Sequence, residues 1–241
     1  MTDKGCVDLS NFFALITNIV FIFPILIAFF RWQYLNKPLR VFLGYCVVTV
    51  LLNLLEWGFI QSTVAHWSFW EPILQKLGIT NTFFLLILYH LKNFIFLGWF
   101  FSLLLTHPAA KWVRGIVITL SIAAVVNYIF IEGYQEAGRF NPTADAIFTF
   151  ILPLYYLWRL YRAVIDVALV KNAYFWISLG LLIPNVIALY FYFTSPDLHN
   201  EDYCLFLWVN MIKNFFEIIG STLLAIGFWR APFVKYITKH I

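Results

Sequence analysis

Five polar residues share one face of the last long apolar stretch of the chain, where they could form an ion pair or bind a polar ligand inside a membrane. They are Asn210, Lys213, Asn214, Glu217 and Ser221, at relative positions 0, 3, 4, 7 and 11. This spacing is that of one helical face. Because Lys213 and Glu217 are four residues apart, they can pair across one turn. Ionisable groups in a membrane helix usually face the bundle interior or a wet cavity, so this face predicts a polar interior site.

Polar residues in three other apolar stretches extend this set to a candidate ligand pocket open to the outside. Its members are Asn53, Glu56, His90, Lys92, Asn93, Asn185, Asn210, Lys213, Asn214 and Glu217. Two lysines and two glutamates can neutralise one another, and the amides could orient a small polar or zwitterionic ligand. The spacing leaves open whether Lys213 pairs with Glu217 or with Glu56. The structural alternative is that the amides bond across helices and the ions persist because removing one partner is costly.

Catalytic and cofactor chemistry is not indicated by any motif. The chain has no H-E-x-x-H sequence, no Cys/His cluster, no glycine-rich phosphate loop and no G-x-S-x-G elbow. We therefore expect no catalytic residue and no metal site, and favour a structural, hydrogen-bonded role for His90. A retinal-type chromophore on Lys213 is disfavoured, because Val209 stands where an acidic counterion is wanted. No cofactor is expected.

Composition places the chain in a membrane. It is 62% hydrophobic and only 12% charged, which is far from the composition of a soluble domain. The apolar runs predict a single all-α domain, 1–241, made of seven transmembrane helices at about 11–30, 39–60, 82–105, 113–131, 146–165, 173–194 and 203–229. The first run is expected to stay as a helix rather than act as a cleaved signal peptide. A nucleic-acid-binding domain does not fit in the remainder, so no nucleic acid is expected as a partner.

Charge asymmetry between loops predicts the orientation. Most basic residues fall in alternate connections and the C-terminal tail: Arg31, Lys37, Arg40, Lys111, Arg114, Arg159, Arg162, Lys171, Arg230, Lys235 and Lys239. The intervening loops are acidic, and Asp145 is assigned to one of them. The positive-inside rule then predicts an N-terminus outside and a C-terminus inside. The longest outer connection, 61–81, is rich in aromatic residues and is expected to lie in the headgroup region or to cap the bundle.

Cysteines and prolines give two further expectations. Cys6 and Cys204 both fall on the expected outer side, so one disulfide is open to them, but sequence supplies no distance and we favour two free thiols. Pro24, Pro153 and Pro184 lie inside apolar runs, where proline removes a helical hydrogen bond. We expect a kink or break at each.

Several stretches resemble a family of seven-helix membrane proteins of Bacteroidota-type bacteria. The matching pieces are Leu88-Tyr-His-Leu-Lys-Asn-Phe-Ile-Phe-Leu, Phe140-Asn-Pro, Phe175-Trp-Ile-Ser-Leu-Gly, Asn210-Met-Ile-Lys-Asn-Phe-Phe and Ala225-Ile-Gly-Phe. The chain departs from the family pattern at Asn93, where an acidic residue is expected. The resemblance implies seven helices in the bacterial inner (cytoplasmic) membrane, a sensory or signalling association with histidine kinases, and no established catalytic site.

These observations favour a receptor- or sensor-like membrane protein that signals through a separate cytoplasmic partner, such as a histidine kinase, with oligomerisation left open. Three rivals use the same residues. A proton- or solute-coupled transporter would show alternating access, and a lipid-modifying intramembrane enzyme would use Glu56, His90 and Lys92. A structural subunit of a membrane complex would have dry, fully paired charges.

Overall fold

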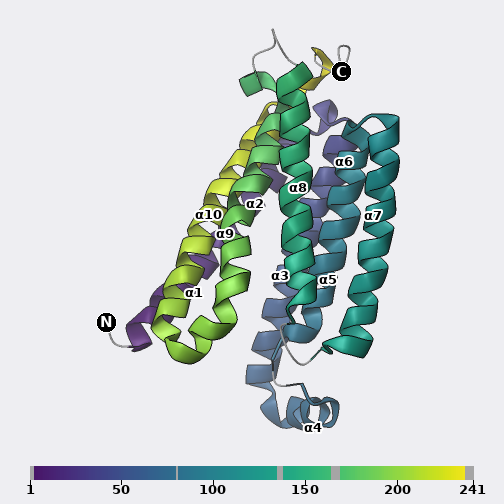
Figure 1. Ribbon diagram of the computed structural model, residues 1–241. Helices are drawn as coiled ribbons and strands as arrows, with labels where there is room; N and C mark the ends of the chain where they lie inside the picture. The colour runs from purple at the N-terminus through teal and green to yellow at the C-terminus, as the bar shows by residue number, and fades with distance from the viewer. Residues whose placement is uncertain (1–2, 80, 135–137, 164–168, 237–241) are drawn as a thin grey trace.

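The computed structural model describes residues 3–79, 81–134, 138–163 and 169–236, and within these residues it assigns helices and no strand. Long helices stand side by side in an elongated bundle, with the N-terminus at one end and the C-terminus near the other (Figure 1). The α-helices are α1 (Asp3–Val20), α2 (Ile22–Phe30), α3 (Lys37–Ala65), α4 (Trp67–Leu77), α5 (Leu86–Lys92), α6 (Gly98–Leu104), α7 (His107–Val126), α8 (Phe140–Ala163), α9 (Ala173–Glu201) and α10 (Tyr203–Trp229). A π-helical turn, Asn93–Leu97, joins α5 to α6, and a second, Asn127–Ile131, extends α7.

Six described segments are long and apolar enough to cross a membrane, which confirms the multi-pass membrane class. They are Gly5–Phe30, Lys37–Ala65, Phe83–Leu104, His107–Ile131, Ala173–Phe191 and Tyr203–Trp229. Large apolar side chains such as Phe12, Phe30, Val64 and Phe130 lie exposed on the outside of the bundle. In a bilayer these side chains would face lipid, so their exposure has no hydrophobic cost there.

Several helix bounds differ from the sequence prediction. The first helix begins at Asp3 rather than near residue 11, α7 at His107 rather than 113, and α8 at Phe140 rather than 146. At the other ends, α3 runs to Ala65 rather than 60 and α9 to Glu201 rather than 194. The predicted end of α8 at 165 lies outside the described residues. The aromatic connection after α3 is itself helical: α4 lies across the end of the bundle that also holds the N-terminus (Figure 1). This placement agrees with the expected capping element.

Of the prolines expected to kink or break helices, only Pro24 lies near a helix boundary. The boundary between α1 and α2 falls at Phe21, three residues before the proline, and Phe21 keeps near-helical dihedral angles, φ −65° and ψ −16°. By contrast, α8 runs through Pro153 and α9 through Pro184 without a break. Neither helix therefore ends at its proline, although each proline lacks the N–H of a helical hydrogen bond, because neighbouring helices can hold the backbone helical there.

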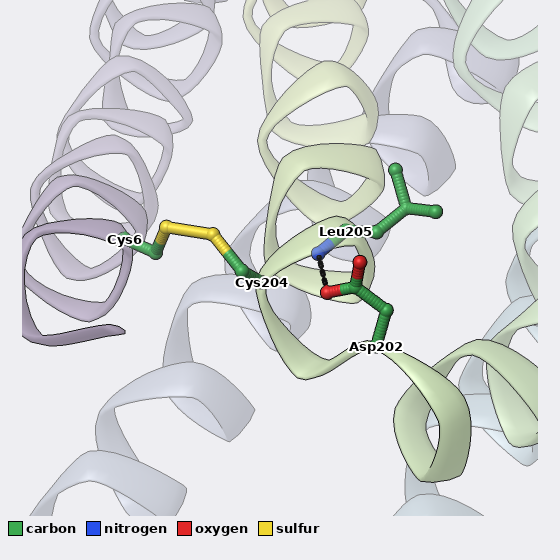
Figure 2. Close-up of a disulfide and its surroundings, with 4 residues drawn as sticks. All are labelled: Cys6, Asp202, Cys204 and Leu205. Carbon is green, nitrogen blue, oxygen red and sulfur yellow. Dashed lines mark hydrogen bonds between the residues drawn. A yellow bond between two sulfur atoms is a disulfide. The ribbon is translucent and has the colours of Figure 1, made fainter. Parts of the chain in front are cut away.

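The prediction of two free thiols is wrong, because Cys6 and Cys204 form a disulfide. Their Cα atoms lie 5.9 Å apart, which is within the usual span of such a bridge. The bond ties the first turns of α1 to the start of α10, where the Asp202 side chain accepts a hydrogen bond from the Leu205 N–H at 2.9 Å (Figure 2). The early start of α1 brings Cys6 to this point, and that start was missed from the sequence.

The apolar core fills the end of the bundle opposite the disulfide. Phe42 stands near the start of α3, and its ring centroid lies 5.0 Å from that of Phe100 and 5.8 Å from that of Phe228. All three side chains are fully buried. Because α3 begins at this end while α6 and α10 finish here, the aromatic cluster closes the bundle on the side of the C-terminus. The buried polar residues described below occupy the other half.

Glu132 organises the connection that leads into α8. One carboxylate oxygen accepts the backbone N–H groups of Arg139 and Phe140, both at 2.9 Å, and the other accepts the Asn127 amide at 2.7 Å. Partial burial works to raise the pKa of Glu132, but these hydrogen bonds and the nearby Arg139 charge outweigh it, so the pKa is lowered. The ionised form therefore stabilises the start of α8.

Replacing Glu132 with glutamine is expected to reduce stability at neutral pH and to flatten its acid dependence. A lowered folded-state pKa means that the carboxylate contributes stability above its unfolded pKa and loses it as pH falls through the folded value. The unfolding midpoint of the wild type should therefore drop below about pH 4 more steeply than that of Glu132→Gln. Thermal unfolding followed by tryptophan fluorescence across acidic and neutral pH measures this. Equal pH profiles for the two proteins would contradict the assignment, and Glu71→Gln, on half-exposed α4, is the control.

Candidate functional site

A cavity of about 380 Å³ lies inside the bundle among α1, α3, α5, α8, α9 and α10. Eight of the ten predicted site residues line it: Asn53, Glu56, His90, Lys92, Asn93, Asn185, Lys213 and Glu217. Its lining residues come from the end of α1, the middle of α3 and the start of α8, among others. The prediction named four helices, and the structure adds α1 and α8 to the lining.

Asp145 is the residue of this site that sequence reasoning missed. It is 8% exposed, and its carboxylate contacts two side chains of the cavity wall. His90 Nδ1 lies 2.8 Å from one carboxylate oxygen, and the Asn93 amide nitrogen lies 2.7 Å and 3.0 Å from the two oxygens. The other ring nitrogen of His90, Nε2, is buried with no hydrogen-bond partner among the described residues.

The assignment of Asp145 to an outer loop failed because α8 begins earlier than predicted. Once Phe140 opens the helix, Asp145 and Thr149 are four residues apart and share one face. The Thr149 hydroxyl lies 2.9 Å from the Asn185 side-chain oxygen, and the Asn185 amide donates to the Leu181 carbonyl at 2.7 Å. This Asp-x-x-x-Thr spacing was the available signal for a polar face on α8.

Glu56 is held by hydroxyl groups rather than by a lysine. The Thr82 hydroxyl donates to one of its oxygens at 2.6 Å, and the Tyr89 hydroxyl lies 2.9 Å from the other. The Tyr89 oxygen also lies 3.0 Å from the Asn53 side-chain oxygen, while the Asn53 amide donates to Asn18 at 2.9 Å. A chain of polar contacts thus runs from α5 through α3 to α1.

The two lysines of the cavity differ in their surroundings. Lys213 pairs with Glu217 on its own helix, with 3.2 Å between Nζ and the carboxylate, so the alternative pairing with Glu56 is not adopted. Lys92 is more deeply buried, at 7% exposure, and its ammonium donates to the Thr49 hydroxyl at 2.9 Å. The ring of Tyr45 lies 4.6 Å from the Lys92 nitrogen, which is cation–π range.

Asn210 and Asn214 are the two predicted members that do not line the cavity. Asn214 is buried, and its backbone carbonyl lies 3.5 Å from the Thr17 hydroxyl, at the contact between α10 and α1. Asn210 is half-exposed and sits one turn nearer the disulfide end. The polar face of α10 is therefore wider than the part that reaches the cavity, because α1 covers one edge of it.

The arrangement combines three carboxylates, two ammonium groups and an imidazole around one small volume, which is suited to binding a polar molecule by charge and hydrogen bonding. Among the described residues, no group of three or more His, Cys, Asp or Glu side chains is placed to hold a metal ion. Comparison with known proteins found no matching family model, no matching curated protein and no matching solved structure.

Proposed function

We propose that this chain is a seven-helix receptor-like membrane protein that binds a small polar ligand in the cavity. The observation that carries the proposal is the cavity itself, because ten carboxylate, lysine, histidine or asparagine side chains from distant parts of the sequence meet there. Charged groups are expensive inside a membrane protein and usually mark a ligand or ion site. A purely structural role would call for paired, close-packed groups, whereas these surround about 380 Å³ of open space.

The seventh span of this proposal is α8. It has 24 residues and is therefore about 36 Å long, enough to cross a hydrocarbon core of about 30 Å. It packs between α5 and α9, which are parts of two apolar spans. Its charged residues keep its composition more polar than that of the six, and one of them, Asp145, is bonded inside the bundle.

The proposed orientation puts the N-terminus outside and the C-terminus inside. Two independent features support it. Exposed Lys37, Arg40, Lys111 and Arg114 cluster at the end where α3 and α7 begin, in line with the positive-inside rule. The disulfide between Cys6 and Cys204 lies at the opposite end, and disulfides persist on the oxidising side of a membrane. The bacterial inner membrane is the proposed location.

A receptor is favoured over a carrier because the bundle is closed on one side. The cavity reaches from the middle of the bundle toward the disulfide end along α3, α5 and α8, while Phe42, Phe100 and Phe228 pack at the other end. A ligand would enter from outside, and its binding would be reported by helix movement to a separate cytoplasmic protein. The resemblance to proteins associated with histidine kinases supports such a kinase as the partner, docked on the basic inner end.

Transport remains the second candidate, because the lysines and carboxylates that line the cavity could also couple a solute or a proton. Uptake of a bound solute into liposomes separates the two functions, because a receptor binds it without accumulating it.

Filling the cavity tests the proposed function. The purified protein in lipid nanodiscs is titrated with four probes of different charge: glycine, acetate, methylammonium and glycerol. We expect at least one probe to raise the thermal unfolding midpoint in a saturable manner. Ala188→Phe, which places a ring into the cavity, should abolish that shift, whereas Ala65→Phe, at an exposed position, should keep it. If no probe distinguishes wild type from Ala188→Phe, the cavity is not a ligand site.

A further inference from the structure

Lys92 places a buried positive charge in the cavity wall without a carboxylate in contact. Its nitrogen donates a hydrogen bond to Thr49 at 2.9 Å and faces the rings of Tyr45 and Tyr89, with the ring centroids at 4.6 and 5.6 Å. Across the part of the chain that the structure describes, the only contacts between acidic and basic side chains within 4.0 Å are His90–Asp145 and Lys213–Glu217. The Lys92 charge is therefore solvated by a hydroxyl and two ring faces, with no counterion at contact distance.

The three carboxylates of the cavity already have other partners. Asp145 binds His90 and Asn93, and Glu56 binds two hydroxyl groups. Glu217 contacts Lys213 at 3.2 Å. None of them is placed to neutralise Lys92 directly. Because an ammonium has three donors and Thr49 accepts only one, Lys92 has donor capacity for an anionic group in the open volume beside it.

A second polar group of the cavity, the Ser221 hydroxyl, has unused hydrogen-bonding capacity. Ser221 is 2% exposed, lines the cavity from α10, and its hydroxyl makes no hydrogen bond with the described residues. Leaving a buried hydroxyl unsatisfied costs about 1–3 kcal/mol. A ligand oxygen in the cavity would satisfy it, so the unused donors of Lys92 and Ser221 both point to a ligand that carries an acceptor.

The mixture of charges in the site decides which kind of anionic group fits. The cavity holds three carboxylates, two ammonium groups and the His90 imidazole, so groups of both signs face the open volume. A zwitterion matches both signs and leaves the charge balance unchanged. Glu217 offers the receiving group, because it contacts Lys213 at 3.2 Å and a carboxylate can accept about four hydrogen bonds.

We propose, resting on the proposed function, that the ligand is a small zwitterion of the amino-acid type. Its carboxylate binds the Lys92 ammonium and the Ser221 hydroxyl, and its ammonium group binds the carboxylate of Glu217. The cavity volume of about 380 Å³ restricts the ligand to a small molecule, near the lower end of the size of ligand pockets. The ligand carboxylate is thus the counterion of Lys92, which no carboxylate of the described residues contacts.

Titration with the common L-amino acids, acetate and methylammonium tests this inference on the full chain in nanodiscs. We expect at least one amino acid to raise the unfolding midpoint saturably, while acetate and methylammonium, which each carry one of the two charges, produce little shift. Lys92→Met and Glu217→Gln should each weaken the apparent affinity at least tenfold. Lys76→Met, at an exposed position on α4, should leave it unchanged.

The outcomes separate the inference from the proposed function. Stabilisation by glycerol or methylammonium alone, lost in Ala188→Phe, would keep the ligand site and overturn the zwitterion. Unchanged amino-acid affinity in Lys92→Met would also overturn it. Should Lys92→Met fail to fold, Ser221→Ala carries the test: it keeps every charge, and it is expected to weaken binding several-fold, whereas wild-type affinity would overturn the inference.

Discussion

Replacing Gly220 with alanine is expected to destabilise the protein by about 3 kcal/mol, at the upper end of the usual cost of overpacking. A Cβ atom at Gly220 would collide with the ring of Pro184 and would lie 2.7 Å from the carbonyl oxygen of Gly180. A Cβ atom at Gly180 would in turn lie 2.8 Å from the Gly220 carbonyl oxygen. Neither obstacle can swing away, because one is a proline ring and the other is backbone. Gly220→Leu should prevent α9 and α10 from packing at all.

The close approach at Gly220 follows from the proline on the facing helix. Pro184 has no N–H, so the Gly180 carbonyl four residues earlier loses its helical partner. The backbone of α10 reaches that carbonyl only because Gly220 has no side chain, and Cα–H groups are weak donors to such oxygens. Small residues at helix contacts serve the same purpose in membrane bundles generally.

Equilibrium unfolding in mixed micelles measures the Gly220→Ala effect against a matched control. Gly115 lies on α7 with nothing within 4 Å of a built Cβ atom. Gly115→Ala should therefore be neutral or stabilising by about 0.5–1 kcal/mol, from helix propensity alone. Similar behaviour of the two variants would show that the α9–α10 contact is looser than described. Because Gly180 and Gly220 also line the cavity, a wider contact should weaken ligand binding as well.

The extent of each helix was predictable where apolar runs are flanked by polar residues. The last helix, expected at 203–229, has those bounds in the structure. The early starts of α1 and α8 were not predicted, because both segments contain acidic residues, which are typical of loops outside the membrane. At Asp8 the acid is exposed, and at Asp145 it is bonded to His90 inside the bundle, so hydrogen bonding across helices overrides hydropathy.

The sequence predicted which residues belong to the candidate site better than it predicted which of them contact one another. The residue types, amides and charges inside apolar runs, select eight of the cavity residues. Pairing depends on helix rotation, which sequence does not supply. The Lys213–Glu217 pair could be predicted, because the two residues are four apart on one helix. The contact of Glu56 with Thr82 and the isolation of Lys92 depend on how α3 and α5 face each other.

The opening of a π-helical turn at Asn93 was also beyond sequence reasoning. The turn Asn93–Leu97 adds a residue to the helical spacing and changes which side chains of this span share a face. His90 and Asn93 are three residues apart and share one face of this span before the turn changes the spacing, and both contact Asp145. Such turns occur often at functional sites. In this chain the turn begins at Asn93, whose amide joins the carboxylate and the imidazole in a single cluster.

Replacing Asp145 with leucine is expected to cost about 3–5 kcal/mol of stability, because it removes one partner of a buried polar pair. His90 is 5% exposed, and both its Nδ1 and the Asn93 amide would be left without their acceptor. Asp145→Asn keeps the shape but turns one acceptor into a donor, and should cost about 1–3 kcal/mol. Asp8→Leu and Asp8→Asn, at an exposed position on α1, are the matched controls and should change stability by no more than about 0.5 kcal/mol.

The double variant His90→Leu/Asp145→Leu tests whether the His90–Asp145 pair serves ligand binding or packing. If each single variant is costly because it strands the other partner, the double variant should be more stable than the sum of the single effects predicts, by about 0.5–3 kcal/mol. Additive effects would mean that His90 and Asp145 do not interact as the 2.8 Å contact indicates. Recovery of folding should not restore function, since the cavity would have lost one carboxylate and the imidazole. A double variant that folds but no longer responds to amino acids would therefore assign the pair to binding rather than to packing.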